Sequence, residues 1–144
     1  MEVVILVGLQ GSGNSTLCRE RYAATHVLVS KDLFRNNRRP QRRQMQLIEE
    51  ALREGKSVVV DNTNATVEDR AAILALARSL GASVACVDVR TPIGECLRRN
   101  AAREGRARVP EKAVWITSAR MRRPTLAEGF DRLERVGWTG EGTR

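Results

Sequence analysis

Residues 8–16 read GLQGSGNST and contain most of a phosphate-binding motif. Gly8, Gly13 and Ser15 match the pattern G-x-x-x-x-G-K-[ST], whose backbone N–H groups cradle the phosphates of a nucleotide. The apolar run VVILV (3–7) precedes this stretch, and a segment of helical character (15–22) follows it. A glycine-rich turn between a buried strand and a helix predicts a P-loop, because the helix N-terminus then faces the phosphates.

One residue departs from the pattern. Asn14 stands where the pattern has lysine, and an amide cannot supply the positive charge that bridges the β- and γ-phosphates. The backbone cradle does not depend on that side chain; its expected members are Gly8, Gly11, Ser12 and Gly13. We therefore predict that the loop binds a nucleoside triphosphate but turns it over slowly, since losing one such electrostatic contact typically costs ~10²–10³ in rate.

Apolar runs alternate with helical segments along the rest of the chain. Short β-branched runs predict buried parallel strands at 3–7, 27–29, 57–60 and 82–89. Helical spacing of apolar residues predicts helices at 15–22, 41–53 and 67–80, the last capped by Thr66. Thr91 and Pro92 are expected to be the N-cap and the first-turn residue of a helix that reaches about Arg103, followed by a helix at 111–121 and a strand at 130–136. This alternation predicts an α/β fold with a doubly wound parallel sheet flanked by helices.

The composition is that of one globular domain spanning residues 1–144, with a flexible tail expected at 139–144. No segment is apolar over a length that could span a membrane, so we expect no membrane association. The cysteines Cys18, Cys86 and Cys96 form no CxxC pair, which favours buried thiols and a cytoplasmic location. The single histidine, His26, cannot by itself build a metal centre or a Ser-His-Asp triad.

The chain is strongly basic. It carries 25 Lys and Arg against 17 Asp and Glu, a formal charge of +8 and a pI near 10.6. Such a surplus favours a polyanionic partner, because basic side chains displace the counterions of nucleic-acid phosphates. The alternative is that arginine serves as a generic surface residue.

The stretch VSKDLFR (29–35) follows the second predicted strand. Asp32 would lie at the carboxyl edge of the sheet beside the P-loop, where a carboxylate can accept a proton from an attacking hydroxyl. Arg35 would share its face of a helical turn and could bind a substrate phosphate through its guanidinium fork. The structural alternative is an N-capping aspartate followed by a solvated arginine.

The stretch VVVDNTN (58–64) follows the third predicted strand. Asp61 takes the place of a Walker-B-type acid, within reach of a magnesium-bound water, and Ser15 can ligate the same Mg²⁺. Asn62 and Thr63 offer neutral hydrogen bonds to nucleotide or acceptor. Without a P-loop nearby, the same residues would be an ordinary Asx-type turn.

The stretch CLRRNAAREGRARVP (96–110) places Arg99 and Arg103 on one helical face. Arginines on a segment that closes over the phosphates can stabilise transition-state charge, so we expect a helical, arginine-bearing lid at about 99–110. A solvated basic helix is the alternative.

Five stretches together resemble the polynucleotide 5′-hydroxyl kinases, and in particular the kinase domain of polynucleotide kinase-phosphatases. They are GLQGSGNST, VSKDLFR, VVVDNTN, RNAAR…VP and RRPTLAEGFDRLERV (122–136), in the order found in that family. The similarity extends from Val3 to about Val136, and PTLAEGF is its most specific part. Members of the family carry lysine where Asn14 stands, so this chain resembles an impaired member.

The resemblance implies a P-loop enzyme that uses ATP or another nucleoside triphosphate, with Mg²⁺, to phosphorylate the 5′-hydroxyl end of DNA or RNA during end repair. By position, Asp32 is similar to the general base and Arg35 to the contact with the phosphate 3′ of the accepting nucleotide. The remaining correspondences are Ser15 and Thr16 for the phosphate- and magnesium-binding hydroxyls, Asp61 for the acid of the third strand, and Arg99 and Arg103 for the lid arginines.

Two other functions stay open. A small-molecule P-loop kinase is one, although a compact neutral acceptor would not require the arginines that accompany the proposed base: Arg35, Arg38, Arg39, Arg42 and Arg43. A non-catalytic module that binds nucleotide or nucleic acid is the other. Only 3% of the residues are aromatic, so base stacking would contribute little to the binding of a nucleic acid.

Overall fold

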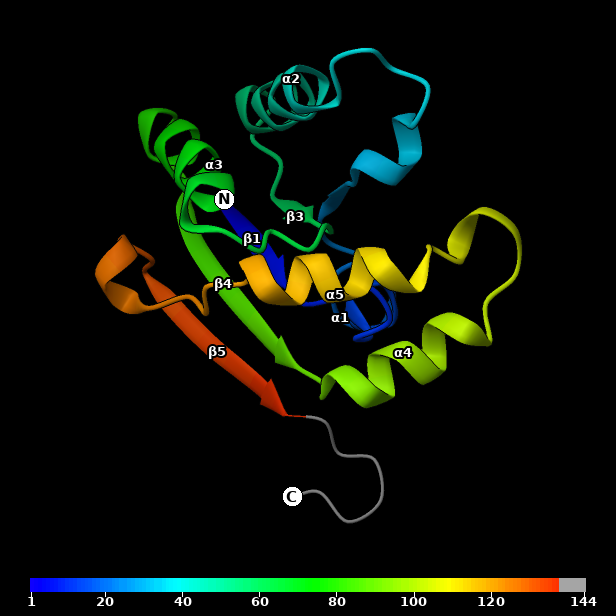
Figure 1. The fold of residues 1–144 in the computed structure, drawn as a ribbon. Helices are drawn as coiled ribbons and strands as arrows, with labels where there is room; N and C mark the ends of the chain where they lie inside the picture. The colour runs from blue at the N-terminus through cyan, green and yellow to red at the C-terminus, as the bar shows by residue number, and fades with distance from the viewer. Residues whose placement is uncertain (138–144) are drawn as a thin grey trace.

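A computed structural model describes residues 1–137, so the predicted flexible tail lies outside the described residues. The chain forms one five-stranded parallel sheet in the order β2-β3-β1-β4-β5, flanked by helices (Figure 1). The strands are Glu2–Val7 (β1), Val27–Val29 (β2), Val58–Val60 (β3), Ser83–Arg90 (β4) and Arg132–Gly137 (β5). The predicted doubly wound α/β fold is confirmed.

β1 lies at the centre of the sheet because it is apolar on both faces. Val3 is in register with Val58 of β3 on one side and with Val84 of β4 on the other. The chain after β1 crosses to β2 and β3 on one side of it, and then returns to β4 on the other side. The carboxyl end of β1 is therefore the switch point at which ligands bind in open α/β sheets.

Helices cover both faces of the sheet. On one face, α2 (Pro40–Arg53) and α3 (Val67–Ser79) pack the apolar side chains of their buried stripes, including Ile48 and Ile73, onto β1, β3 and β4. On the other face, α1 (Asn14–Arg21) buries Cys18 beside Leu6 and Val87. Strands covered on both faces explain why the sequence shows continuous apolar runs rather than alternation.

A third cluster joins the P-loop to the last two long helices. α4 (Ile93–Ala101) and α5 (Glu111–Arg120) lie beside each other near the carboxyl end of β4 (Figure 1), with Leu9, Cys96 and Val114 buried between them and the loop. Three short 3-10 turns complete the chain: Lys31–Phe34 (η1), Gly105–Ala107 (η2) and Leu126–Glu128 (η3). No helix among residues 1–137 combines the length and the apolarity needed to cross a bilayer.

One predicted helix cap is confirmed and another is wrong. Thr66 caps α3, accepting a hydrogen bond from the backbone N–H of Asp69, whose carboxylate accepts one from the N–H of Thr66. Thr91 does not cap α4, which begins after Pro92 and makes no side-chain cap bond there. The hydroxyl of Thr91 instead donates to the carbonyl of Ser12 over 2.6 Å, and so fastens β4 to the P-loop.

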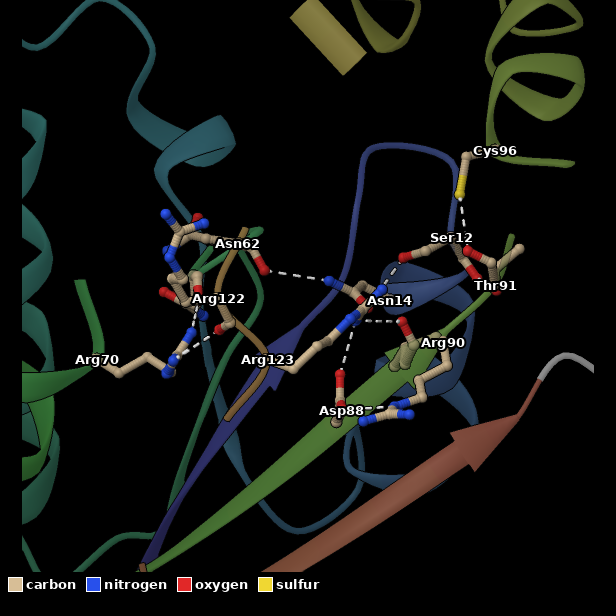
Figure 2. Close-up of polar contacts among 12 residues, drawn as sticks. Ser12, Asn14, Asn62, Arg70, Asp88, Arg90, Thr91, Cys96, Arg122 and Arg123 are labelled. Atoms are coloured by element: carbon tan, nitrogen blue, oxygen red, sulfur yellow. Dashed lines mark hydrogen bonds and ion pairs between the residues drawn. The ribbon is translucent and has the colours of Figure 1, made fainter. Parts of the chain in front are cut away.

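The C-terminal segment is tied to the core by buried charges. Arg70 of α3 is fully buried and pairs with Glu128 of η3 at 2.9 Å, while also donating to the carbonyls of Asn64 and Arg122. Asp88 of β4 is also fully buried and accepts from Arg123 at 2.7 Å and from Arg90 at 2.9 Å (Figure 2). Losing Glu128 would leave the fully buried guanidinium of Arg70 without its carboxylate partner, a change that typically costs about 3–5 kcal/mol of folding free energy.

Candidate nucleotide and acceptor site

Two adjoining cavities lie at the carboxyl edge of the sheet. The larger is about 670 Å³ and is lined by the P-loop, η1, the loop after β3 and Arg103. The smaller is about 450 Å³ and lies between the P-loop, α1, the ends of β4 and β5, and the side chains of Arg99 and Arg103. Every residue predicted for the site lines one of these cavities. Those of the larger are Gly8, Gly11, Asn14, Ser15, Thr16, Asp32, Arg35, Asp61 and Arg103; Ser12, Gly13 and Arg99 line the smaller.

The glycines of the P-loop are required by its close packing. Gly11 has φ +83°, and a Cβ there would lie 2.4 Å from the carbonyl oxygen of Cys96 in α4. Gly13 has φ +106°, in the left-handed region, immediately before α1. The Gly8 N–H donates to the carbonyl of Thr63 at 3.1 Å, so the loop is anchored to the segment after β3.

The orientation of the Ser12–Gly13 peptide is fixed from outside the loop. The Ser12 carbonyl accepts from the hydroxyl of Thr91 at 2.6 Å and from the guanidinium of Arg99 at 3.2 Å. Because the C=O and N–H of a trans peptide point in opposite directions, the Gly13 N–H is turned away from these two donors. Arg99 is held in turn by Glu95, whose pKa falls to about 2 because Arg98 and Arg99 donate to it.

The side chain of Asn14 is held by hydrogen bonds within the protein. Its side chain is 9% exposed; its Nδ2 donates to the carbonyl of Asn62 at 3.1 Å, and its Oδ1 accepts from the hydroxyl of Ser12 at 3.2 Å (Figure 2). The amide therefore links the P-loop to the loop after β3. It brings no charge to the cavity that it lines.

Ser15 and Asp61 meet at the mouth of the larger cavity. The Ser15 hydroxyl donates to Oδ2 of Asp61 at 2.9 Å, although 46 residues separate them in the chain. A hydroxyl and a carboxylate beside a phosphate cradle are the oxygen ligands that Mg²⁺ uses in nucleotide sites, so these residues fit that ion. Burial raises the pKa of the Asp61 carboxyl, and the hydrogen bond from Ser15 only partly opposes this effect.

The raised pKa of Asp61 predicts that its charge costs stability. Above the raised pKa, the folded protein holds in a buried site a charge that the unfolded chain keeps in water, so ionisation lowers the free energy of unfolding. We expect Asp61→Asn to raise the melting temperature at pH 8. This gain should shrink as the pH falls through the raised pKa toward 3.8, the ordinary value for aspartate.

Thermal melting at pH 8 and at about pH 4, close to the ordinary pKa of aspartate, measures this effect. Glu54→Gln is the matched control, because Glu54 is exposed and forms a surface ion pair with Lys56 at 2.9 Å. A gain from Asp61→Asn that is equal at both pH values, or a loss of stability at pH 8, would contradict the prediction.

Asp32 and Arg35 line the larger cavity from η1 and from the residue that follows it. The Asp32 side chain is 78% exposed, and Oδ1 lies 3.5 Å from the Arg35 guanidinium. Arg35 also donates to the carbonyl of Arg106 in η2 at 2.9 Å, so it joins η1 to the segment predicted as a lid. α4 ends at Ala101, so Arg103 lies beyond the helix rather than on it, and it donates to the carbonyl of Ala107 at 3.3 Å.

Asn62 has a structural role that the sequence did not indicate. Its Nδ2 donates to the buried Gln44 of α2 at 2.6 Å, and its Oδ1 accepts from the backbone N–H of Lys31 at 2.9 Å. Both side-chain groups are therefore used inside the protein, which does not fit the prediction that Asn62 contacts a substrate. Gln44 could have been noticed, since it shares the buried face of α2 with Ile48 and Ala51.

The arginines near η1 are directed to solvent. Arg38, Arg39 and Arg42 are exposed around the start of α2, whereas Arg43 is half-buried and lies 3.9 Å from Glu50. They extend the positive charge of the cavity wall that carries Asp32 and Arg35.

Comparison with known proteins places this site in a family. A family model described as "AAA domain" matches residues 3–124. The bifunctional polynucleotide phosphatase/kinase of Schizosaccharomyces pombe is 30% identical over 139 residues, which cover 94% of this chain and 33% of that protein. The chain thus spans about a third of the length of this curated relative.

Solved structures share the fold. Kti12 of Chaetomium thermophilum in complex with ADP-AlF3 has a TM-score of 0.71 and 15% identity, covering 97% of this chain and 91% of that one. A gluconokinase from Sinorhizobium meliloti 1021 has a TM-score of 0.66 and 17% identity, covering 94% and 82%. These similarities show that the chain shares its fold with these two proteins.

Proposed function

The chain belongs to the AAA domain family, and on that premise we propose that it is an ATP-dependent polynucleotide 5′-hydroxyl kinase whose turnover is reduced by Asn14. One observation carries the choice of acceptor. The exposed carboxylate of Asp32 and the guanidinium of Arg35 lie 3.5 Å apart on the cavity wall that continues into exposed arginines. The end of a polynucleotide matches that arrangement, because it presents a 5′-hydroxyl near a phosphate and carries further phosphates along its backbone.

In the proposed reaction the P-loop binds the phosphates of ATP, and the acceptor enters along η1. Asp32 accepts the proton of the 5′-hydroxyl as the hydroxyl oxygen forms a bond to the γ-phosphorus. The bond between the γ-phosphorus and the β–γ bridging oxygen breaks, and ADP leaves with that electron pair. Arg35 releases the carbonyl of Arg106 and binds the acceptor phosphate instead. The guanidinium thereby replaces a neutral hydrogen-bond acceptor with a charged one.

The remaining residues act on the donor. Arg99 and Arg103 face the smaller cavity and would neutralise charge on the phosphates. Ser15 and Asp61 would hold Mg²⁺, which when bound offsets the negative charge of the β- and γ-phosphate oxygens.

A small-molecule kinase is the second candidate, since the gluconokinase shares the fold. A compact acceptor needs an enclosed pocket that surrounds it, whereas Asp32 is largely exposed and Arg38, Arg39 and Arg42 extend outward from it. The yeast relative, whose name includes a polynucleotide kinase activity, also favours the polymeric acceptor.

The two candidates differ in their response to salt. We expect transfer of radiolabelled γ-phosphate to a single-stranded oligonucleotide with a 5′-hydroxyl, and none to the same oligonucleotide with a 5′-phosphate or to gluconate. Affinity for the oligonucleotide should fall steeply with salt, by about 0.7 log units per log unit of salt for each phosphate bound. The triple variant Arg38→Gln, Arg39→Gln, Arg42→Gln should lower that slope.

A matched triple of exposed arginines elsewhere controls for net charge. Arg53 at the last residue of α2, Arg78 of α3 and Arg120 of α5 are exposed, and their replacement by glutamine removes the same charge away from the cavity. Transfer to gluconate but not to the oligonucleotide, or equal changes of slope in the two triple variants, would rule against the polynucleotide acceptor.

A further inference from the structure

The larger cavity has four cationic side chains, and one of them has no partner. Arg19 donates to the hydroxyl of Thr16 at 3.4 Å, and Arg35 and Arg103 donate to backbone carbonyls. The ammonium group of Lys31 forms no hydrogen bond or ion pair with any of residues 1–137. It is therefore free to bind an anion in the cavity.

Lys31 is also close to the P-loop position that lacks a lysine. Its backbone N–H donates to the Asn62 side chain at 2.9 Å, while Asn14 donates to the backbone carbonyl of the same Asn62 at 3.1 Å. Asn62 thus connects Lys31 with Asn14 at the edge of the cavity. A lysine carries its charge on a flexible four-carbon stem, so its ammonium can reach well beyond its own backbone.

We propose that Lys31 supplies part of the positive charge that Asn14 does not, by contacting the γ-phosphate of the bound nucleoside triphosphate from the η1 side. Its position directly before Asp32 places this charge on the wall where the acceptor hydroxyl would enter. The proposal rests on the proposed function only for the identity of the acceptor; the contact with the triphosphate does not depend on it.

Arg19 is the other cation of the cavity to be compared with Lys31 as a contact for the γ-phosphate. It lies one helical turn beyond Ser15 on α1 and lowers the pKa of Asp61, so its charge acts at the carboxylate that would hold Mg²⁺. Arg19 already has the hydroxyl of Thr16 as a partner, whereas the ammonium of Lys31, in η1 after β2, has none among residues 1–137.

The test compares Lys31→Met with Lys56→Met, an exposed lysine paired with Glu54 at 2.9 Å. Competition against a fluorescent nucleotide gives the affinities for ATP and ADP. Lys31→Met should weaken ATP binding by about tenfold or more while changing ADP binding little, since only ATP has the γ-phosphate; it should also lower kcat by about 10². Lys31→Arg should recover part of both, and Lys56→Met should change neither.

A second arm uses the Asn14→Lys background. If the two cations serve the same phosphate, Lys31→Met should have a much smaller effect on ATP binding there, because effects at coupled sites do not add. An unchanged ratio of ATP to ADP affinity, an equal loss of both nucleotides, or an equal effect in the two backgrounds would overturn the proposal. If no variant phosphorylates an oligonucleotide but the ATP preference still depends on Lys31, the polynucleotide acceptor is wrong and the role of Lys31 stands.

Discussion

Asn14→Lys should raise phosphoryl transfer to a 5′-hydroxyl oligonucleotide by about 10²–10³-fold, the effect of restoring one preorganised charge at the transferred group. The backbone cradle, the Ser15–Asp61 pair and the exposed carboxylate of Asp32 are already in place around that position. A lysine at 14 would extend its longer, charged side chain from a position that already lines the cavity. Initial rates with radiolabelled ATP measure the gain.

Asn14→Met is the control for this gain. Methionine has nearly the length of lysine without its charge, so it separates the electrostatic effect from the loss of the Asn14–Asn62 hydrogen bond. We expect its rate to stay at or below that of the unchanged chain. If Asn14→Lys binds ATP and the oligonucleotide but transfers no phosphate, the chain is a binding module and the kinase proposal fails.

Asp32→Ala in the Asn14→Lys background should lower transfer by about 10²–10⁴-fold, the usual contribution of a positioned general base. ATP affinity should change little, because the Asp32 side chain is 78% exposed and its recorded partner is Arg35, not the P-loop. Single-turnover rates and nucleotide competition assays together distinguish the two effects.

Two further variants sharpen this test. Asp32→Asn keeps the size of the side chain and removes the basic oxygen, so it should be nearly as inactive as alanine. Glu54→Gln removes a distant surface carboxylate and should be fully active. Retention of most of the rate by Asp32→Asn would mean that another group, or water, accepts the proton, and Asp32 would then act only by holding Arg35.

The centre of the sheet could be predicted from sequence because β1, β3 and β4 are buried on both faces. Continuous runs such as Val3–Val7 and Val58–Val60 have no amphipathic alternation to obscure them, and α2 has a clear apolar stripe. The end of α4 was predicted too late, at about Arg103 instead of Ala101, because the helical pattern of Arg99 and Arg103 does not show where the backbone turns. Helix ends depend on such local geometry.

The meeting of Ser15 with Asp61 was also predictable, because parallel strands bring the residues after them to one edge of the sheet. The hydrogen bonds that hold the site residues in place from other parts of the fold were not predictable. Thr91 looked like a helix cap and Asn62 like a substrate contact, but their partners, Ser12 and Gln44, are brought to them only by the tertiary fold. A short polar side chain carries no sequence signal of which distant group it will bond.

PTLAEGF was the most specific fragment of the family resemblance, and its chemistry is now visible. Glu128 pairs with the buried Arg70, Gly129 adopts φ +114°, and Phe130 packs into the larger core cluster. These contacts explain the fragment without any role in catalysis. They also lie beyond the residues matched by the family model.

The buried guanidinium of Arg70 has a consequence for how the protein is made. Its partners Arg122 and Glu128 come 52 and 58 residues later in the chain. At a synthesis rate of about 5–20 residues per second, the ribosome needs about 3–12 s to add 58 residues, and during that time Arg70 has no carboxylate to accompany it into the core. Helix α3 must therefore stay undocked, or leave Arg70 in water, until Glu128 has emerged from the exit tunnel. Docking of α3 is in this way coupled to the synthesis of the later segment that carries Glu128.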